Sequence, residues 1–210
     1  MRAIPALFLC VIAVAGCGGR RVLVPPRMEL APRAPIGLVT FTVENAQGSL
    51  KELATQRFAQ HALDAQPGIE VLELGEVPGR IDAAAARALG EEHGLRAVFA
   101  GHIVVSDVRP RVSLGRGLRA TAEATVTMTV RMLSTETGGT VWTQSARTRE
   151  AIAAIQILDG GVVFAADDPE EAYGDLVNRL VFRLTHDFRA TWQRAERQLT
   201  DDGRRTTVLP

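Results

Sequence analysis

The sequence lacks most of the features that identify a metalloprotein, a nucleotide-binding protein or a nucleic-acid-binding protein. Cys10 and Cys17 are its only cysteines, too few for a zinc site built on cysteine. Basic and acidic side chains balance at 24 each, so no basic excess points to a nucleic-acid partner. The single lysine, Lys51, follows Leu50 and not glycine, which excludes the phosphate-binding P-loop motif.

The chain also lacks a long apolar run. The one at its start, from Ala3 to Ala15, has 13 residues, whereas a membrane-spanning helix needs about 20. Arg2 precedes this run, Pro5 interrupts its beginning, and small residues follow it. A basic start, a short apolar run and a small-residue exit are typical of a secretory signal. We expect a signal peptide over residues 1–16.

The exit reads Val14-Ala15-Gly16-Cys17 and resembles the bacterial lipobox. The resemblance implies that Cys17 is acylated and becomes the first residue of the mature chain, held to a lipid bilayer. Gly18 follows it, and by resemblance to enterobacterial sorting this favours the outer membrane, with the body facing the periplasm; inner-membrane anchoring stays open. The alternative is an ordinary signal peptide that happens to contain a cysteine.

Proline and arginine dominate the next segment, so we interpret residues 17–35 as the lipidated cysteine and an extended tether. About 18 such residues reach roughly 60 Å when fully stretched. We assign residues 36–198 to one α/β domain and residues 199–210 to a flexible tail.

Residues 36–105 predict the order β-α-β-α-β. The apolar, β-branched segment 36–43 is typical of a central strand, and Ser49 and Glu52 have the spacing of a capping box for the following helix, which Pro67-Gly68 ends. A second strand is expected at 69–74. Asp82 is expected to cap an alanine-rich helix that stops at Gly94, and a long strand follows at 95–105.

Residues 120–132 alternate strictly between apolar and polar, which is a strong strand pattern. We expect a turn at 135–139 and a partner strand at 140–148, with one face of the sheet packed on helices and the other wet. Residues 151–166 are ambiguous, and we interpret them as a short helix followed by a loop or strand. A long C-terminal helix should start at a cap, Asp168, and run for about 25 residues.

Candidate catalytic groups are few. Gly115–Ala120 matches a dinucleotide-binding string, but it leads into a strand and not a helix. His93, His102 and Asp168 are the acid–base candidates, but a solvated helix end, a satisfied strand position and a helix cap are the explanations that we favour for them. We therefore expect no enzyme activity, no cofactor and no metal.

Trp142 follows a Gly-Gly turn in the expected hairpin and has two interpretations. It is buried under the C-terminal helix, which we favour, or it is a candidate contact for a protein partner.

Two stretches resemble the CsgG/LpoB group of envelope lipoproteins: Ala88-Leu89-Gly90 with Gly94–Gly101, and Leu133–Trp142 with the strand before it. The resemblance implies an anticodon-binding-domain-like sandwich, a mixed sheet with helices packed on it, used without nucleic acid; the amino-terminal domain of TolB is similar in shape. This sequence departs from the pattern of that group at two places. Ser134 or Glu136 stands where the group usually has an aspartate before the turn, and Thr140 stands where it has an acid after the turn.

The leading hypothesis is a non-catalytic lipoprotein that binds another envelope protein, for example a cell-wall synthase. The alternative is a subunit of an oligomeric export channel, and therefore a homo-oligomer. A hydrolase that uses His93, His102 or Asp168 is a third option.

Overall fold

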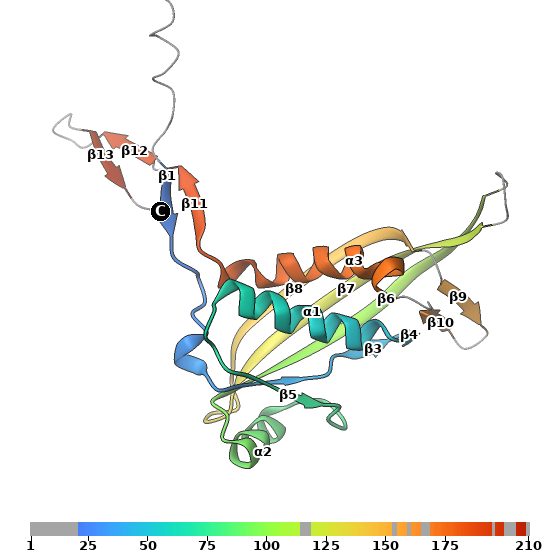
Figure 1. The fold of residues 1–210 in the computed structure, drawn as a ribbon, viewed down its shortest axis with the longest axis horizontal. Coiled ribbons are helices and arrows are strands. Elements are labelled where there is room, and N and C mark those ends of the chain that lie inside the picture. Colours follow the sequence, from blue (N-terminus) through green and yellow to red (C-terminus); the bar gives the residue numbers. More distant parts are fainter. Residues whose placement is uncertain are drawn as a thin grey trace, which may run out of the picture. The chain divides into compact units, whose positions relative to one another are not determined.

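The chain is built around a mixed β-sheet with helices on both of its faces (Figure 1). The computed structural model describes residues 21–113, 119–152, 155–158, 161–164, 169–194, 196–199 and 205–208. They fall into two compact units. Residues 27–189 form the unit that we call the body, and the segments before residue 27 and after residue 189 form the other.

The helices of the body are η2, α1, α2, α3 and η3, at Ala31–Arg33, Leu50–Ala65, Ala83–His93, Pro169–Leu184 and Thr185–Phe188. Its strands β2 to β10 are Ile36–Val39, Thr42–Glu44, Ala46–Gly48, Val71–Gly75, Ala97–Ser113, Arg119–Ser134, Thr140–Ile152, Ile155–Leu158 and Gly161–Phe164. The other unit contains β1, β11, β12 and β13, at Arg21–Val24, Thr191–Arg194, Glu196–Leu199 and Arg205–Val208.

The central sheet has the order β5-β2-β6-β7-β8, and β3 also pairs with β6. The pairs between β2 and β5 and between β2 and β6 are parallel, whereas β6, β7 and β8 run antiparallel. The crossover from β2 to β5 runs in one direction and the crossover from β5 to β6 returns past β2. Because such crossovers are right-handed, the helices that they contain, α1 and α2, lie on opposite faces. The mixed α/β fold expected from the sequence is confirmed.

Helix α2 begins and ends as its sequence predicts. The Asp82 carboxylate accepts hydrogen bonds of 2.9 Å from the N–H groups of Ala84 and Ala85, and Gly94 closes the helix at a φ of 68°. The capping box expected for α1 is wrong. Ser49 makes no side-chain cap bond, because its hydroxyl instead hydrogen-bonds the phenol of Tyr173 on α3.

The main core lies between the sheet and the helix pair α1 and α3. Phe58 of α1 packs against Phe41, Phe99 and Phe188, with ring centroids 5.5, 5.0 and 6.3 Å away. The apolar members of the alternating strand β7 face this core: Ala124, Val126, Met128, Val130 and Met132 are all fully buried. Gly101 is required beneath Phe41, because a Cβ there would lie 2.3 Å from the ring.

The second face of the sheet is covered only in part. Helix α2 packs over one end, where Val39, Leu89, Val98 and Leu133 form a smaller apolar cluster. The rest of this face carries polar side chains that are partly exposed. The expected contrast between one packed face and one wet face is therefore confirmed.

The short helix expected within residues 151–166 is wrong. Strand β8 continues to Ile152, and β9 and β10 form an antiparallel hairpin. Strand β10 also pairs in parallel with β4. Isoleucine and valine dominate this segment and favour a strand, and its pairing with β4, more than 100 residues earlier in the chain, is a tertiary contact that a local pattern does not contain.

The C-terminal helix is present, but α3 ends at Leu184 and a tighter helical turn, η3, carries Phe188 into the core. Thr191 and Trp192, which the sequence analysis places on the helix, lie in strand β11. The carbonyls of Asp187 and Phe188 explain the change. They accept bonds from the Met28 N–H and the Gln66 amide, whereas a continuing helix would need them for the N–H groups four residues later.

The expected tether is structured in its described part. Leu30 is fully buried in the main core, because its N–H donates to Gln66 Oε1 at 2.7 Å and anchors the segment on the end of α1. Strand β1 pairs with β11. Part of the expected tail also differs, since β13 pairs with β12. Cys17 and Asp168 lie outside the described residues, as do residues 115–118 of the Gly-rich string.

No helix within the described ranges combines the length and the apolar character needed to cross a membrane.

We expect Gln66→Ala to lower the free energy of unfolding by about 2 kcal/mol, because it leaves the Leu30 N–H buried without a partner. It also removes the bonds to the carbonyls of Met28 and Phe188. Urea denaturation measures this change. Gln56→Ala, at an exposed site on the same helix, is the control and should stay within about 0.5 kcal/mol of wild type. Equal values for the two variants would contradict the structural role of Gln66.

Candidate binding surfaces

The uncovered part of the second sheet face is a polar surface built by regular structure. We call it the open sheet face, and its outward side chains come from β3, β6, β7 and β8. The strand register aligns Thr42, His102, Thr129 and Ser145 in one row across all four strands. Neighbours in this row are hydrogen-bonded: Thr42 Oγ1 lies 2.9 Å from His102 Nδ1, and the hydroxyls of Thr129 and Ser145 are 3.0 Å apart.

Charges of both signs border this row. His102 Nε2 lies 3.3 Å from a Glu44 carboxylate oxygen, and its side chain is 48% exposed. Farther along the strands, Arg149 pairs with Glu123 at 2.8 Å. Arg147 approaches Asp107 at 3.6 Å, both being largely exposed. A surface that mixes hydroxyl, imidazole, carboxylate and guanidinium groups suits another protein better than a polyanion.

A hollow of about 740 Å³ lies where the open sheet face meets the loop before α2. Its floor includes Ala100, His102 and Thr129 of the sheet, and Ile81 and Val77 from the loop before α2 form part of its wall. Arg131 crosses this hollow and donates a hydrogen bond of 3.2 Å to the carbonyl of Ile81. The hollow therefore joins a small apolar area to the polar row.

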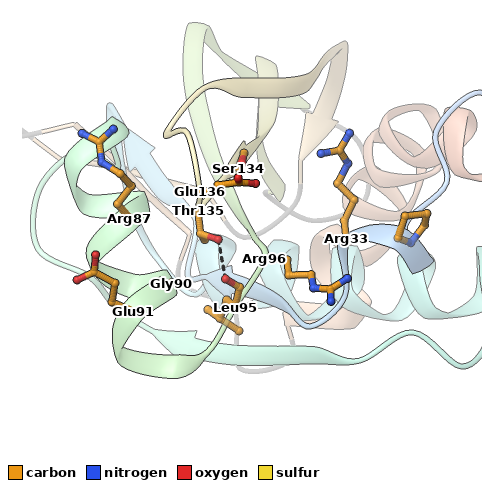
Figure 2. Close-up of a pocket in the computed structure, with 10 residues that line it drawn as sticks. Arg33, Arg87, Gly90, Glu91, Leu95, Arg96, Ser134, Thr135 and Glu136 are labelled. Atoms are coloured by element: carbon orange, nitrogen blue, oxygen red, sulfur yellow. Dashed lines mark hydrogen bonds between the residues drawn. The ribbon is translucent and has the colours of Figure 1, made fainter.

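A second hollow, of about 570 Å³, lies at the other side of α2 and contains three arginines (Figure 2). Figure 2 shows Arg33 and Arg96 on one side of the Thr135–Leu95 hydrogen bond and Arg87 on the other. Arg87 donates to the carbonyl of Thr137 at 3.2 Å. Glu91 and Glu136 also line this hollow, so its charge is mixed.

The two sequence stretches that carry the CsgG/LpoB resemblance meet at this second hollow. The Thr135 hydroxyl donates to the carbonyl of Leu95 at 2.6 Å, and its N–H donates to the carbonyl of Arg96. Gly90 makes this possible, since a Cβ there would lie 2.4 Å from Thr135 Cβ. These residues form a joint between α2 and the β7–β8 turn, so their role is structural.

Ser134 replaces the aspartate that the resemblance leads one to expect before the turn. Its hydroxyl accepts a bond of 3.3 Å from the Thr137 N–H, and Gly138 supplies a φ of 71°. Of the two candidates, Ser134 therefore accepts the hydrogen bond that a turn-forming aspartate would accept.

Trp142 is half-buried in the main core. Its ring lies 4.8 Å from that of Phe188, centroid to centroid, and its Nε1 donates to Asp187 at 3.3 Å. It packs against η3, the turn that follows the C-terminal helix, so the structure gives it a packing role. Its role as a partner contact stays a prediction.

Among the sequence candidates for chemistry, the described histidines lie in separate places. His93 is at the end of α2, 3.8 Å from Glu92, and His102 is in the polar row. The sequence analysis did not single out Thr42, Thr129 or Ser145. The alternation along β7 places Thr129 on the polar face, but Thr42 and Ser145 join it only through strand pairing.

The surroundings of His61 change its proton affinity. It lies on α1 and accepts a hydrogen bond of 2.7 Å at Nδ1 from Arg189. Burial, and then the positive charge of Arg189, lower its pKa, against smaller opposing effects of Asn178 and Asp64. The structure thus favours a neutral His61.

No family model and no curated protein sequence matches this chain. Solved structures similar to it include a PelC dodecamer from Paraburkholderia phytofirmans, at 14% identity and a TM-score of 0.48, covering 82% of this chain and 99% of that one. Lipoprotein GNA1162 from Neisseria meningitidis has 16% identity and a TM-score of 0.36, with coverages of 55% and 82%. The LpoB C-terminal domain from Salmonella enterica has 12% identity and a TM-score of 0.36, with coverages of 68% and 93%.

At such identities, and with TM-scores below 0.5, we draw no argument about this chain from these likenesses.

We expect Gly90→Ala to destabilise the protein by about 1–3 kcal/mol, because the new methyl group overpacks the joint with Thr135. Helix propensity alone predicts the opposite sign, since alanine is favoured over glycine in a helix by about 1 kcal/mol. Gly174→Ala in α3 is the matched control: its Cβ meets only the flexible carboxylate end of Glu170, so it should be neutral or stabilising. Denaturant unfolding of both variants measures these changes in stability. A Gly90→Ala variant more stable than wild type would contradict the close packing of Gly90 against Thr135.

We expect the body to lose stability as the pH falls below about 6.5, the ordinary pKa of histidine. A lowered pKa in the folded state means that the unfolded chain binds the proton first, so the loss continues until the folded pKa is passed. His61→Gln, which keeps an acceptor for Arg189, should flatten this part of the melting-temperature profile. Gln56→Ala, at an exposed site on α1 without a titratable side chain, should leave the wild-type profile unchanged. An unaltered profile for His61→Gln would show that another group controls the loss.

Proposed function

We propose that this chain is a non-catalytic envelope lipoprotein of the CsgG/LpoB type, anchored through acylated Cys17. Its α/β body binds another protein of the cell envelope, for which a cell-wall synthase is one example. The proposed location is the outer membrane, with the body facing the periplasm. The lipobox ending at Cys17 supports the anchor.

The open sheet face is the observation that carries the binding role. It presents hydroxyls and charges of both signs on strands held rigidly by a packed core. Rigid placement lowers the entropy lost when a partner docks. The hollow beside His102, which has Val77 and Ile81 in its lining, offers room for an anchoring side chain of the partner.

Both His102 and His61 have hydrogen-bond partners within the body. In His102, Nδ1 lies against Thr42 and Nε2 against Glu44, both across parallel strands. In His61, Arg189 occupies Nδ1. Cross-strand bonds of this kind fix the sheet register.

We expect a photo-crosslinking residue at Thr143, an exposed outward site on β8, to capture an envelope protein in intact cells. The same residue at Gln56, on the exposed face of α1, is the control and should capture little. Mass spectrometry of the crosslinked band identifies the partner. Equal capture at both sites would remove the open sheet face from the proposal, and capture mainly of a second copy of this chain would favour the export-channel alternative.

The anchor has its own test. The mass of the amino-terminal fragment of protein from cells should correspond to a chain that begins at acylated Cys17. A fragment that still begins at Met1 without a lipid would refute the anchor.

A further inference from the structure

Outside the body, β1 and β11 form a two-stranded antiparallel ribbon. Its register pairs Arg21 with Arg194, and Leu23 with Trp192. These segments are some 170 residues apart in the sequence, so the ribbon brings together residues that no local pattern connects.

Alternation along both strands puts four of these side chains on one side. Arg21, Leu23, Trp192 and Arg194 are all exposed, whereas the residues between them are half-buried. Trp192 is 66% exposed and Leu23 is 53% exposed, which are the two highest values among the large apolar side chains described. One side of the ribbon thus combines an apolar pair with two guanidinium groups.

This arrangement is unfavourable in water alone. Like charges placed directly opposite in a β-ladder destabilise it, and none of the side chains that the structure describes forms an ion pair with Arg21 or Arg194. An exposed tryptophan ring gains no free energy from burial while it faces water. A surface that offers anions beside an apolar layer would stabilise both the arginine pair and the apolar pair.

The distance along the chain identifies such a surface. Only three residues separate Cys17 from Arg21, so four peptide steps, at most about 14 Å, connect the cysteine to the ribbon. This reach is less than half the thickness of a bilayer hydrocarbon core, about 30 Å. An acyl chain on Cys17 therefore holds the ribbon at the headgroups.

We propose that the β1–β11 ribbon is a membrane-interface contact, in which Trp192 and Leu23 enter the headgroup region and Arg21 and Arg194 bind anionic headgroups. The proposal rests on the proposed anchoring at Cys17 and adds a second attachment to it. Tryptophan favours the membrane–water interface because its ring is amphipathic. Arginine near an anionic surface contributes about 1 kcal/mol per side chain.

The experiment uses the chain of residues 17–210, in which Cys17 is the only cysteine. Its thiol is coupled to a maleimide lipid in vesicles of phosphatidylcholine and phosphatidylglycerol, so the test does not depend on acylation in the cell. The chain has two tryptophans, and Trp142→Phe leaves Trp192 as the only indole. Brominated lipids then report by quenching whether this indole enters the bilayer.

We expect quenching and a blue shift of Trp192 emission in the coupled protein. In the matched control, Trp192→Phe, the remaining Trp142 should be unaffected because it packs against Phe188. The uncoupled chain with Cys17→Ser and Trp142→Phe should partition weakly into the anionic vesicles. Replacing both Arg21 and Arg194 by glutamine should lower that partitioning roughly 30-fold, whereas the same change at Arg80 and Arg96 of the body should have little effect.

Three results would overturn the proposal. Trp192 emission that does not change in the coupled protein would show that the ribbon does not meet the bilayer. Equal quenching of Trp142 and Trp192 would show general adsorption of the chain. A blue shift of Trp192 that depends on protein concentration without vesicles would assign this side of the ribbon to a second copy. Failure of acylation in cells alters none of these outcomes, so it is distinguishable from failure of the ribbon contact.

Discussion

The side chain of Gln66 fixes the places where the chain enters and leaves the body. Its oxygen accepts from Leu30, and its amide donates to the carbonyls of Met28 and Phe188, at 2.7 to 3.0 Å. Met28 and Asp187 are also bonded directly through their backbones. Because one amide binds both segments, Met28 and Phe188 lie close together in the body, next to Gln66. A paired ribbon can then form from segments distant in sequence.

The sequence predicts some elements well and others poorly, depending on whether local or distant residues determine them. Strands β6, β7 and β8 follow from alternation, and helix α2 follows from a cap at Asp82; both signals lie within the elements or next to them in the sequence. The end of α3 depends on partners about 120 and 160 residues away, Gln66 and Met28. The apolar stripe that continues past Leu184 indicated a longer helix, and only tertiary bonds overrule it.

The candidate sites show the same division between local and distant information. The motif residues Gly90, Thr135 and Gly138 are visible in the sequence, yet the structure uses them to join α2 to a turn. The polar row of the open sheet face was not singled out, because threonine in an alternating strand is what any half-exposed sheet contains. His102 acquires its neighbours only when β3 pairs with β6. Sequence patterns here identify the fold better than the surface.

Covalent geometry limits how far from Cys17 the body can begin. Ten peptide steps separate Cys17 from Arg27, the first residue of the body, so the body begins within about 35 Å of the anchor. The sequence alone allowed a reach of roughly 60 Å, because it counted residues 27–35 as spacer, but Leu30 is buried in the core. If the anchor is present, the first residue of the body is therefore held closer to it than the length of the proline-rich and arginine-rich segment alone indicated.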